Sequence, residues 1–174
     1  MLDVVLRLST ILLFIIWRIY WWTSEKKADR EKPKLREKNT LFARQNIEKY
    51  TSWFFYLVVF LQLIGLILFP MKNNEQVFGF VIVVIGFFIL ISARRELSTN
   101  WANAREHQIK QKQTLVTTGV YSYIRHPIYS GLLLCMFGAE LVAQSYLFFV
   151  CIIGIYAASM QSRREEKIRF ATLW

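Results

Sequence analysis

The stretch TLVTTGVYSYIRHPIYSGLLL, residues Thr114 to Leu134, is where a polar, aromatic-rich segment changes into a helix apolar enough for a membrane. Pro127 predicts the first position of that helix, because proline fits the first turn and is costly further in. Arg125 and His126 stand just before it, where unpaired backbone N–H groups and the helix dipole favour an anion. The stretch therefore predicts an anion-binding site at the start of an apolar helix.

The composition and its arrangement place the chain in a membrane. Of its 174 residues 55% are hydrophobic and 16% are aromatic, and the apolar residues form long runs between charged blocks. The runs cover 2–22, 53–69, 77–93, 128–142 and 146–160. The last two are joined by little more than Ala143-Gln144-Ser145, which predicts a tight helical hairpin. We expect an all-α, polytopic membrane protein with about five transmembrane helices.

All the runs are expected to belong to one domain over 1–174. Residues 1–93 would hold three spans and a highly charged connector at 24–49, which we interpret as a solvated loop with helical pieces lying on anionic headgroups. Residues 94–174 would hold the predicted anion site and the hairpin. Cys135 and Cys151 fall inside apolar runs without metal-ligand spacing, so no metal site is expected.

The net charge of +10 is interpreted as membrane topology. Most lysines and arginines lie at 24–50, at 94–127 and in the tail after Gln161, all on one side if the apolar runs span. The positive-inside rule makes that side cytoplasmic, with the N-terminus outside, in a bacterial inner membrane or the endoplasmic reticulum. The same charges would attract anionic lipid headgroups. No basic stripe is interleaved with stacking aromatics, so nucleic acid binding is not expected.

A polar cluster at the start of the fourth run could form a binding site. In a helix opened by Pro127, His126 and Tyr129 are three residues apart and Arg125 and Tyr129 are four apart, so their side chains can meet. Gly131 leaves room for close approach of another helix or a ligand. The spacing equally allows a purely interfacial cap, with Tyr129 in the aromatic belt.

A second cluster, Glu165-Glu166, leaves the hairpin that Arg125 and His126 enter. Both ends of a hairpin return to the same height. A zwitterionic small molecule could then place its carboxylate at the first cluster and its ammonium at the glutamates. A solvated helix end with local ion pairs is the alternative that the residues leave open.

These residues resemble the isoprenylcysteine carboxyl methyltransferase and phospholipid methyltransferase superfamily over about residues 94–167. The resemblance rests on Asn100-Trp101, Thr118-Gly119-Val120-Tyr121, Arg125-His126-Pro127-Ile128-Tyr129-Ser130-Gly131, the following hairpin and Glu165-Glu166. Two features differ from the family pattern. Ser98-Thr99 stands where a glycine often precedes Asn-Trp, and Arg169 to Trp174 has no Phe-Gly and tyrosine-containing segment.

The resemblance implies an integral membrane enzyme that transfers a methyl group from S-adenosylmethionine to a membrane lipid or lipidated acceptor. It assigns a cytoplasmic-face cofactor site to eight residues: Tyr121, Arg125, His126, Pro127, Tyr129, Gly131, Glu165 and Glu166. Asn100 and Trp101 would bind the acceptor. A prenylcysteine-type carboxylate, giving O-methylation, is the acceptor we favour, because it needs a cation to hold it but no general base.

Arg94 or Arg95 is our hypothesis for that cation, against the alternative that both only end the third helix as topogenic charges. Three other functions stay open. They are N-methylation of a phospholipid or another amine, an NADPH-dependent reduction like that of sterol reductases, and non-enzymatic binding of anionic lipid. Sterol-type reductases share an Arg-His-Pro motif but often have Asn where this chain has Ile128.

Overall fold

The computed structural model describes residues 1–31, 34–35, 56–66, 75–98, 109–110, 116–149 and 160. Their regular structure is helical apart from one short strand pair, which agrees with the predicted all-α class. The elements in chain order are α1 (Leu2–Glu31), β1 (Lys34–Leu35), a helical segment at 56–63, α3 (Gln76–Leu97), β2 (Ile109–Lys110), the 3₁₀ turn η3 (Gly119–Ser122), α4 (Pro127–Ala143) and the 3₁₀ turn η4 (Tyr146–Phe149). The antiparallel pairing of β1 with β2 has no counterpart in the sequence predictions.

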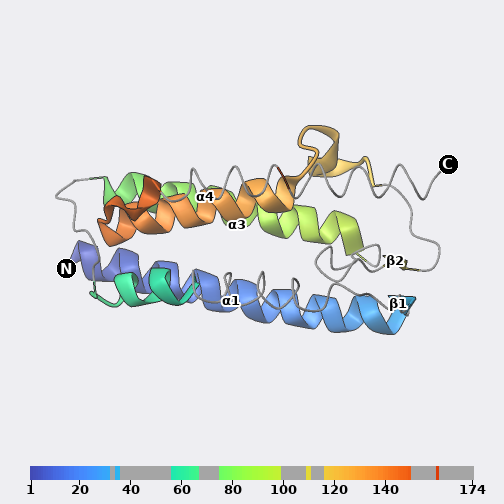
Figure 1. Ribbon diagram of the computed structural model, residues 1–174, viewed down its shortest axis with the longest axis horizontal. Coiled ribbons are helices and arrows are strands. Elements are labelled where there is room, and N and C mark those ends of the chain that lie inside the picture. The colour runs from blue at the N-terminus through green and yellow to red at the C-terminus, as the bar shows by residue number, and fades with distance from the viewer. Residues whose placement is uncertain are drawn as a thin grey trace.

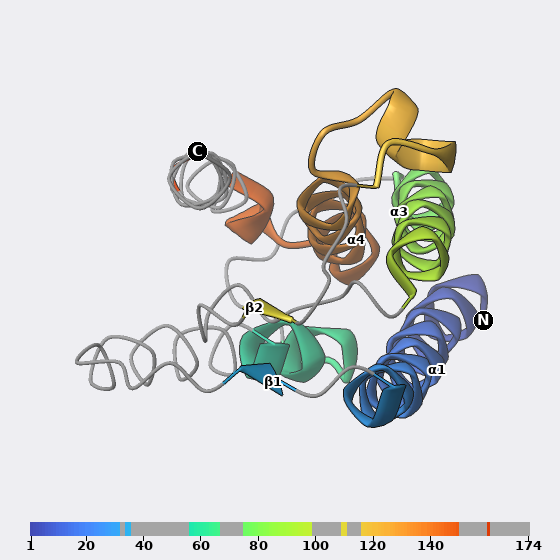
Figure 2. The same ribbon diagram turned by 90° about the vertical axis from the view of Figure 1, so that its right-hand side faces the viewer.

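The long helices lie side by side. α1 and α3 run in the same direction, and α4 runs back along α3 (Figure 1). Seen end on, α1, α3, α4 and the helical segment at 56–63 occupy the four corners of a bundle (Figure 2). The apolar core between them includes side chains from every corner: Leu6, Trp17, Val59, Leu63, Val83, Phe87, Leu90, Cys135, Ala139 and Val142.

Glycines bring α3 and α4 into backbone contact. Gly79 and Gly86 are seven residues apart on α3, as are Gly131 and Gly138 on α4, so each pair lies on one helix face. A Cβ atom at Gly86 would lie 2.9 Å from the Gly131 carbonyl oxygen, and one at Gly138 would lie 2.5 Å from the Gly79 carbonyl oxygen. Larger residues would push the helices apart. The expectation that Gly131 permits close approach of another helix is confirmed.

The helical segment at 56–63 ends inside the second apolar run. The Leu66 N–H donates to the Leu61 carbonyl and the Gly65 N–H to the Gln62 carbonyl, both at 3.0 Å, and Gly65 has φ +107°. This is a Schellman cap, which glycine forms without the strain that a Cβ would bring at positive φ. The described helix therefore ends within the apolar run 53–69, because hydropathy does not register the cap at Gly65.

α4 ends in a similar cap, with Gln144 in the left-handed region. The Gln144 N–H bonds to the Leu141 carbonyl, and the Ser145 N–H to the Glu140 carbonyl at 3.0 Å. The other two terminal carbonyls receive side chains. Gln76 Nε2 lies 3.2 Å from the Val142 oxygen, and an Arg7 guanidinium nitrogen lies 3.3 Å from the Ala143 oxygen. All four carbonyls that a helix end leaves unpaired thus have donors.

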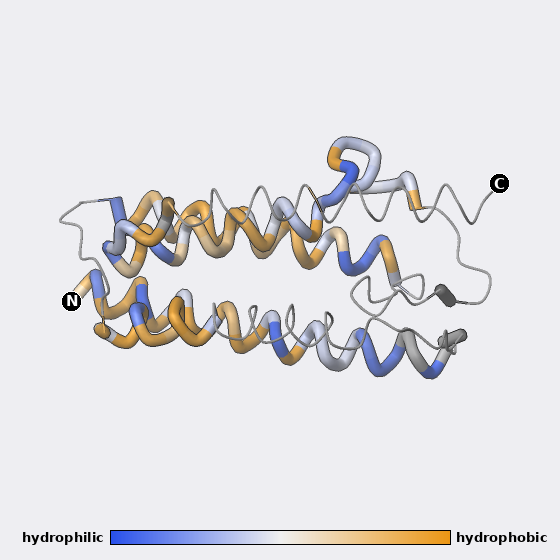
Figure 3. Tube along the Cα trace, viewed as in Figure 1, coloured by the Kyte–Doolittle hydropathy of each residue, from blue (hydrophilic) through white to orange (hydrophobic). Residues whose placement is uncertain are grey.

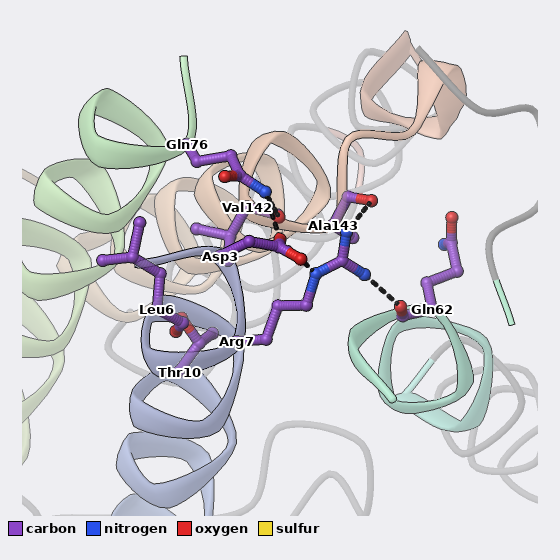
Figure 4. Close-up of polar contacts among 8 residues, drawn as sticks. All are labelled: Asp3, Leu6, Arg7, Thr10, Gln62, Gln76, Val142 and Ala143. Carbon is purple, nitrogen blue, oxygen red and sulfur yellow. Dashed lines mark hydrogen bonds and ion pairs between the residues drawn. The ribbon is translucent and has the colours of Figure 1, made fainter. Parts of the chain in front are cut away.

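Arg7 connects three helices at this end of the bundle (Figure 4). Only 7% of the residue is exposed. Its Nε bonds to Asp3 at 2.7 Å, Nη1 to the Gln62 carbonyl at 3.0 Å and Nη2 to the Ala143 carbonyl. A cation at two helix carboxyl ends also matches the sign of both helix dipoles.

Glu140 completes this polar end of the bundle. Its carboxylate is almost fully buried, and the Gln62 side-chain amide lies 3.0 Å from both of its oxygens. From its place near the end of an apolar run, Glu140 is expected at a membrane interface. The structure instead places it between α4 and the segment at 56–63, so a run called apolar from sequence carries a buried polar contact between helices.

Among the described helices, α3 is the one long and apolar enough to cross a membrane by length and composition, and α4 is apolar but shorter. Large apolar side chains on the outside of α1 and α3 are exposed, among them Leu12, Ile16, Phe78, Val81 and Phe88. Hydrophilic residues gather at the carboxyl ends of α1 and α3 and in the short stretch between η3 and α4 (Figure 3). The count of five spans and the orientation of the termini stay predictions. The first run of the predicted C-terminal hairpin is described as α4, whereas most of the second run, 146–160, and most of residues 24–49 lie outside the described residues.

Candidate functional site

The turn that precedes α4 is closed by its own backbone. The Tyr121 N–H donates to the Thr118 carbonyl at 3.1 Å, and the Ile124 N–H to the Val120 carbonyl at 3.0 Å. Gly119 has φ +57°, a conformation that costs a residue with a Cβ about 1–2 kcal/mol. The sequence Thr117-Thr118-Gly119 therefore leads into a turn, η3. This turn sets the direction in which the chain enters α4.

α4 begins as the sequence predicted. Pro127 is buried at the first helical turn and His126 is the residue before it, with φ −128° and ψ 63°. The Ser130 N–H and hydroxyl both donate to the His126 carbonyl, at 3.1 and 3.2 Å. The His126 and Tyr129 rings lie 6.0 Å apart between centroids, so the predicted contact three residues apart is confirmed.

The other residues of the predicted cofactor motif divide between surface and interior. Arg125 is exposed and Tyr121 is half-buried. Gly131 is buried against α3, where an added Cβ would lie 2.8 Å from the Leu90 side chain. A glycine at 131 is thus explained by the packing of α3 on α4, because only a residue without a side chain allows this close contact. Arg125 and His126, by contrast, stand at the exposed entrance of α4, where an anionic group can reach them.

The structure separates the two arginines that the sequence left equivalent. Arg94 is fully buried at the end of α3, with Nη1 3.0 Å from the Ser98 carbonyl, whereas Arg95 is exposed. The Arg94 guanidinium carbon lies 5.4 Å from the centre of the Trp21 ring on α1, a cation–π distance. Trp21 was not among the predicted site residues. Its place among the aromatics that end the first apolar run pointed to a membrane anchor.

The aromatic cluster behind Trp21 extends from α1 into the core. Trp17 lies 5.1 Å from Trp21 and 6.3 Å from Phe87 between ring centroids, and Phe14 packs edge-on against Phe87 at 5.1 Å. Trp17 is buried. The wall behind Arg94 is therefore apolar and built by two helices.

Glu96 brings the end of α3 to η3. Its carboxylate accepts a hydrogen bond of 2.9 Å from the Thr118 hydroxyl. The end of α3 is therefore connected to the residue just before η3, the turn that leads into α4. Asn100, Trp101, Glu165 and Glu166 lie outside the described residues, so the two-ended arrangement for a zwitterion stays a prediction.

In general class, the protein is an apolar helical bundle with a polar site at one end. Residues 74–169 match the phospholipid methyltransferase family, which is more than half of the 174 residues, and the chain belongs to that family.

Two curated relatives each align with about half of the chain. The chain is 29% identical over 100 residues to a protein-S-isoprenylcysteine O-methyltransferase of Xenopus laevis, covering 56% of this chain and 34% of the relative. It is 28% identical over 92 residues to a phosphatidylethanolamine N-methyltransferase of Scheffersomyces stipitis, covering 51% of this chain and 10% of the relative. The chain thus matches about a third and a tenth of these two proteins.

Proposed function

We propose that the protein transfers a methyl group from S-adenosylmethionine to a lipidic acceptor at a membrane. The observation that carries the proposal is the α4 entrance. In a chain of the phospholipid methyltransferase family, it presents an exposed Arg125 beside His126 and Tyr129, next to the end of α3 that holds Arg94. Both named relatives are methyltransferases and neither is a reductase, so the reductase alternative is not carried further.

The residues present fit the methionine end of the cofactor. Arg125, the ring of His126 and the first turn of α4 suit its carboxylate, because a guanidinium, an imidazole and the positive end of the helix dipole lie together there. Tyr121 and Tyr129 flank this entrance, and Gly131 lets α3 come close behind it. Glu165 and Glu166 would hold the ammonium. When bound, the cofactor supplies an electrophilic methyl group on a sulfonium.

The chain's own task is alignment. Displacement on a sulfonium breaks the S–C bond as the acceptor's bond to carbon forms, and the sulfonium charge disappears in the process. Positioning and exclusion of water supply most of the effect that such a step needs. The apolar wall of Trp17 and Phe87 behind Arg94 suits water exclusion, and the buried guanidinium suits a carboxylate.

We propose a carboxylate acceptor of the prenylcysteine type, held by Arg94 against Trp21, with Asn100 and Trp101 also on the acceptor side. Arg95 is the weaker candidate because it is exposed. N-methylation of a phospholipid amine is the second candidate, and the name of the family and of the Scheffersomyces stipitis relative favour it. An amine acceptor would lose a proton, for which Glu or Tyr is the available base.

The membrane partners follow from α1. We propose a multi-pass protein with its basic segments on the cytoplasmic side. Thr23, Lys26, Lys27 and Arg30 line one hollow near the end of α1, and the Lys26 ammonium lies 3.5 Å over the Trp22 ring. A cationic face that continues an exposed apolar helix suits anionic lipid headgroups.

The test is a purified chain in detergent with labelled S-adenosylmethionine and two acceptors, a farnesylated cysteine derivative and phosphatidylethanolamine. We expect label in the farnesylcysteine product, released as methanol by mild alkali because it is a methyl ester. Alkali-stable label in the phospholipid would establish the second candidate instead. Absence of both cofactor binding and methyl transfer would refute the proposed function.

A further inference from the structure

Glu96, at the end of α3, makes contacts that the predicted site did not include. Its carboxylate accepts the Thr118 hydroxyl at 2.9 Å and lies directly over the α carbon of Gly119, where any Cβ would overlap it. Gly119 has φ +57°, so its backbone conformation favours glycine, and a Cβ there would displace the end of the Glu96 side chain. The turn and the carboxylate fit each other closely.

The Thr118 hydroxyl does not cap the turn that follows it. Thr118 is the residue before η3 with extended backbone angles, φ −94° and ψ 168°, a position from which threonine commonly caps a helix. No side-chain cap is made here. The hydroxyl donates to Glu96 on another element instead, so a local capping bond is replaced by a contact 22 residues away in the chain.

The end of α3 faces two partners at once. Residues two apart on a helix point to nearly opposite sides. Arg94 accordingly lies against Trp21 of α1, and Glu96 reaches η3, which lies on the side of α3 away from α1 (Figure 2). A single helical turn therefore joins the proposed acceptor side to the turn that leads into the α4 entrance.

We infer that Glu96 is a positioning residue, which through Thr118 and Gly119 holds η3 so that Tyr121, Arg125 and His126 stand in register for the cofactor. This inference rests on the proposed methyl transfer and adds a residue to that same site. Glu96 itself need not touch either substrate. The hydrogen bond requires an acceptor at 96 and a hydroxyl at 118, and a charge at 96 is not required.

The variants are chosen to separate the hydrogen bond from the charge at residue 96. Glu96→Ala and Thr118→Val remove the bond, whereas Glu96→Gln and Thr118→Ser keep an acceptor and a donor. Thr117→Val is the matched control, because it makes the same substitution at the neighbouring exposed threonine. Each purified variant is assayed for cofactor Kd, for KM of both substrates, and for hydrogen exchange of the amides at 117–124.

We expect Glu96→Ala and Thr118→Val each to raise the cofactor Kd and KM about fivefold, the factor that one ordinary hydrogen bond of about 1 kcal/mol corresponds to. Exchange at 117–124 should speed up, while the acceptor KM changes less than twofold and Glu96→Gln, Thr118→Ser and Thr117→Val stay near wild type. The double variant Glu96→Ala/Thr118→Val should be no worse than either single variant, because both remove one bond.

Unchanged cofactor affinity and unchanged exchange in Glu96→Ala, in a wild-type background that binds the cofactor, would overturn this inference alone. Equal losses in Glu96→Gln and Glu96→Ala would also overturn it, since they would show that charge acts instead of the hydrogen bond. A wild-type chain without cofactor binding would overturn the proposed function and the role of Glu96 with it.

Discussion

Replacing Arg7 with leucine should destabilise the bundle far from the proposed site. Arg7 is buried and donates to two helix ends, at the Gln62 and Ala143 carbonyls. Loss of the guanidinium leaves the Ala143 carbonyl without its donor, at a cost of about 1–3 kcal/mol for a buried group. The Gln62 carbonyl keeps the Gly65 N–H as donor, so losing its hydrogen bond from Arg7 costs less, about 1 kcal/mol.

The ion pair with Asp3 adds little, because the Asp3 side chain is 47% exposed and a solvated pair contributes about 0–1 kcal/mol. Together these effects amount to about 2–5 kcal/mol, which corresponds to a drop in melting temperature of roughly 4–20 °C for a chain of this size. Arg7→Lys should lose about half as much. A lysine keeps the charge but offers one compact donor group for two carbonyls.

The assay is thermal unfolding in a fixed detergent, followed by tryptophan fluorescence. Arg18→Leu is the matched control, an exposed arginine on the same helix that should shift the melting temperature by no more than about 2 °C. If Arg7→Leu and Arg18→Leu unfold within 1 °C of each other, roughly the precision of the melt, the double helix-end contact does not stabilise the protein and the reasoning is refuted.

Three further predictions concern the helix interface and the site. Gly138→Ala should cost about 1–3 kcal/mol in the same melt, because its Cβ would lie 2.5 Å from the Gly79 carbonyl, and the exposed control Phe88→Ala should cost less; equal shifts would count against the backbone contact. His126→Ala should weaken cofactor binding about tenfold by equilibrium dialysis with the melting temperature unchanged, and unaltered binding would remove His126 from the site. Arg94→Lys should raise the KM of a carboxylate acceptor about tenfold or more while the cofactor KM holds, and a larger effect from Arg95→Lys would reverse the assignment.

The elements that could be predicted from the sequence are those with strong local signals. Pro127 marks a helix start because its ring fits the first turn and nowhere later, and α4 begins there. Gly131 could be assigned to a close contact because a glycine in an apolar helix has few other reasons to persist. Both signals depend on a residue's own covalent geometry, so tertiary structure has little power to change them.

The features that escaped prediction depend on partners distant in sequence. Hydropathy places Gln62 and Glu140 in apolar runs, and only the bundle shows that they bond to each other. Gly65 ends a helix within an apolar run, where hydropathy alone predicts continuation. The difference between Arg94 and Arg95 likewise depends on Trp21, which is more than 70 residues away along the chain.

The polar contacts of the bundle are concentrated at opposite ends, and this separation suits the proposed chemistry. At one end Arg7, Gln62 and Gln76 satisfy helix carbonyls and leave the glycine-packed pair of α3 and α4 with little freedom to slide. At the other end the contacts are more exposed, as at Glu96 with Thr118. A site that must admit a polar cofactor and a lipid needs local opening, and elements with few buried contacts open most readily. Rigidity at the Arg7 end should let η3 move without loss of the helix pair that carries Arg94 and His126.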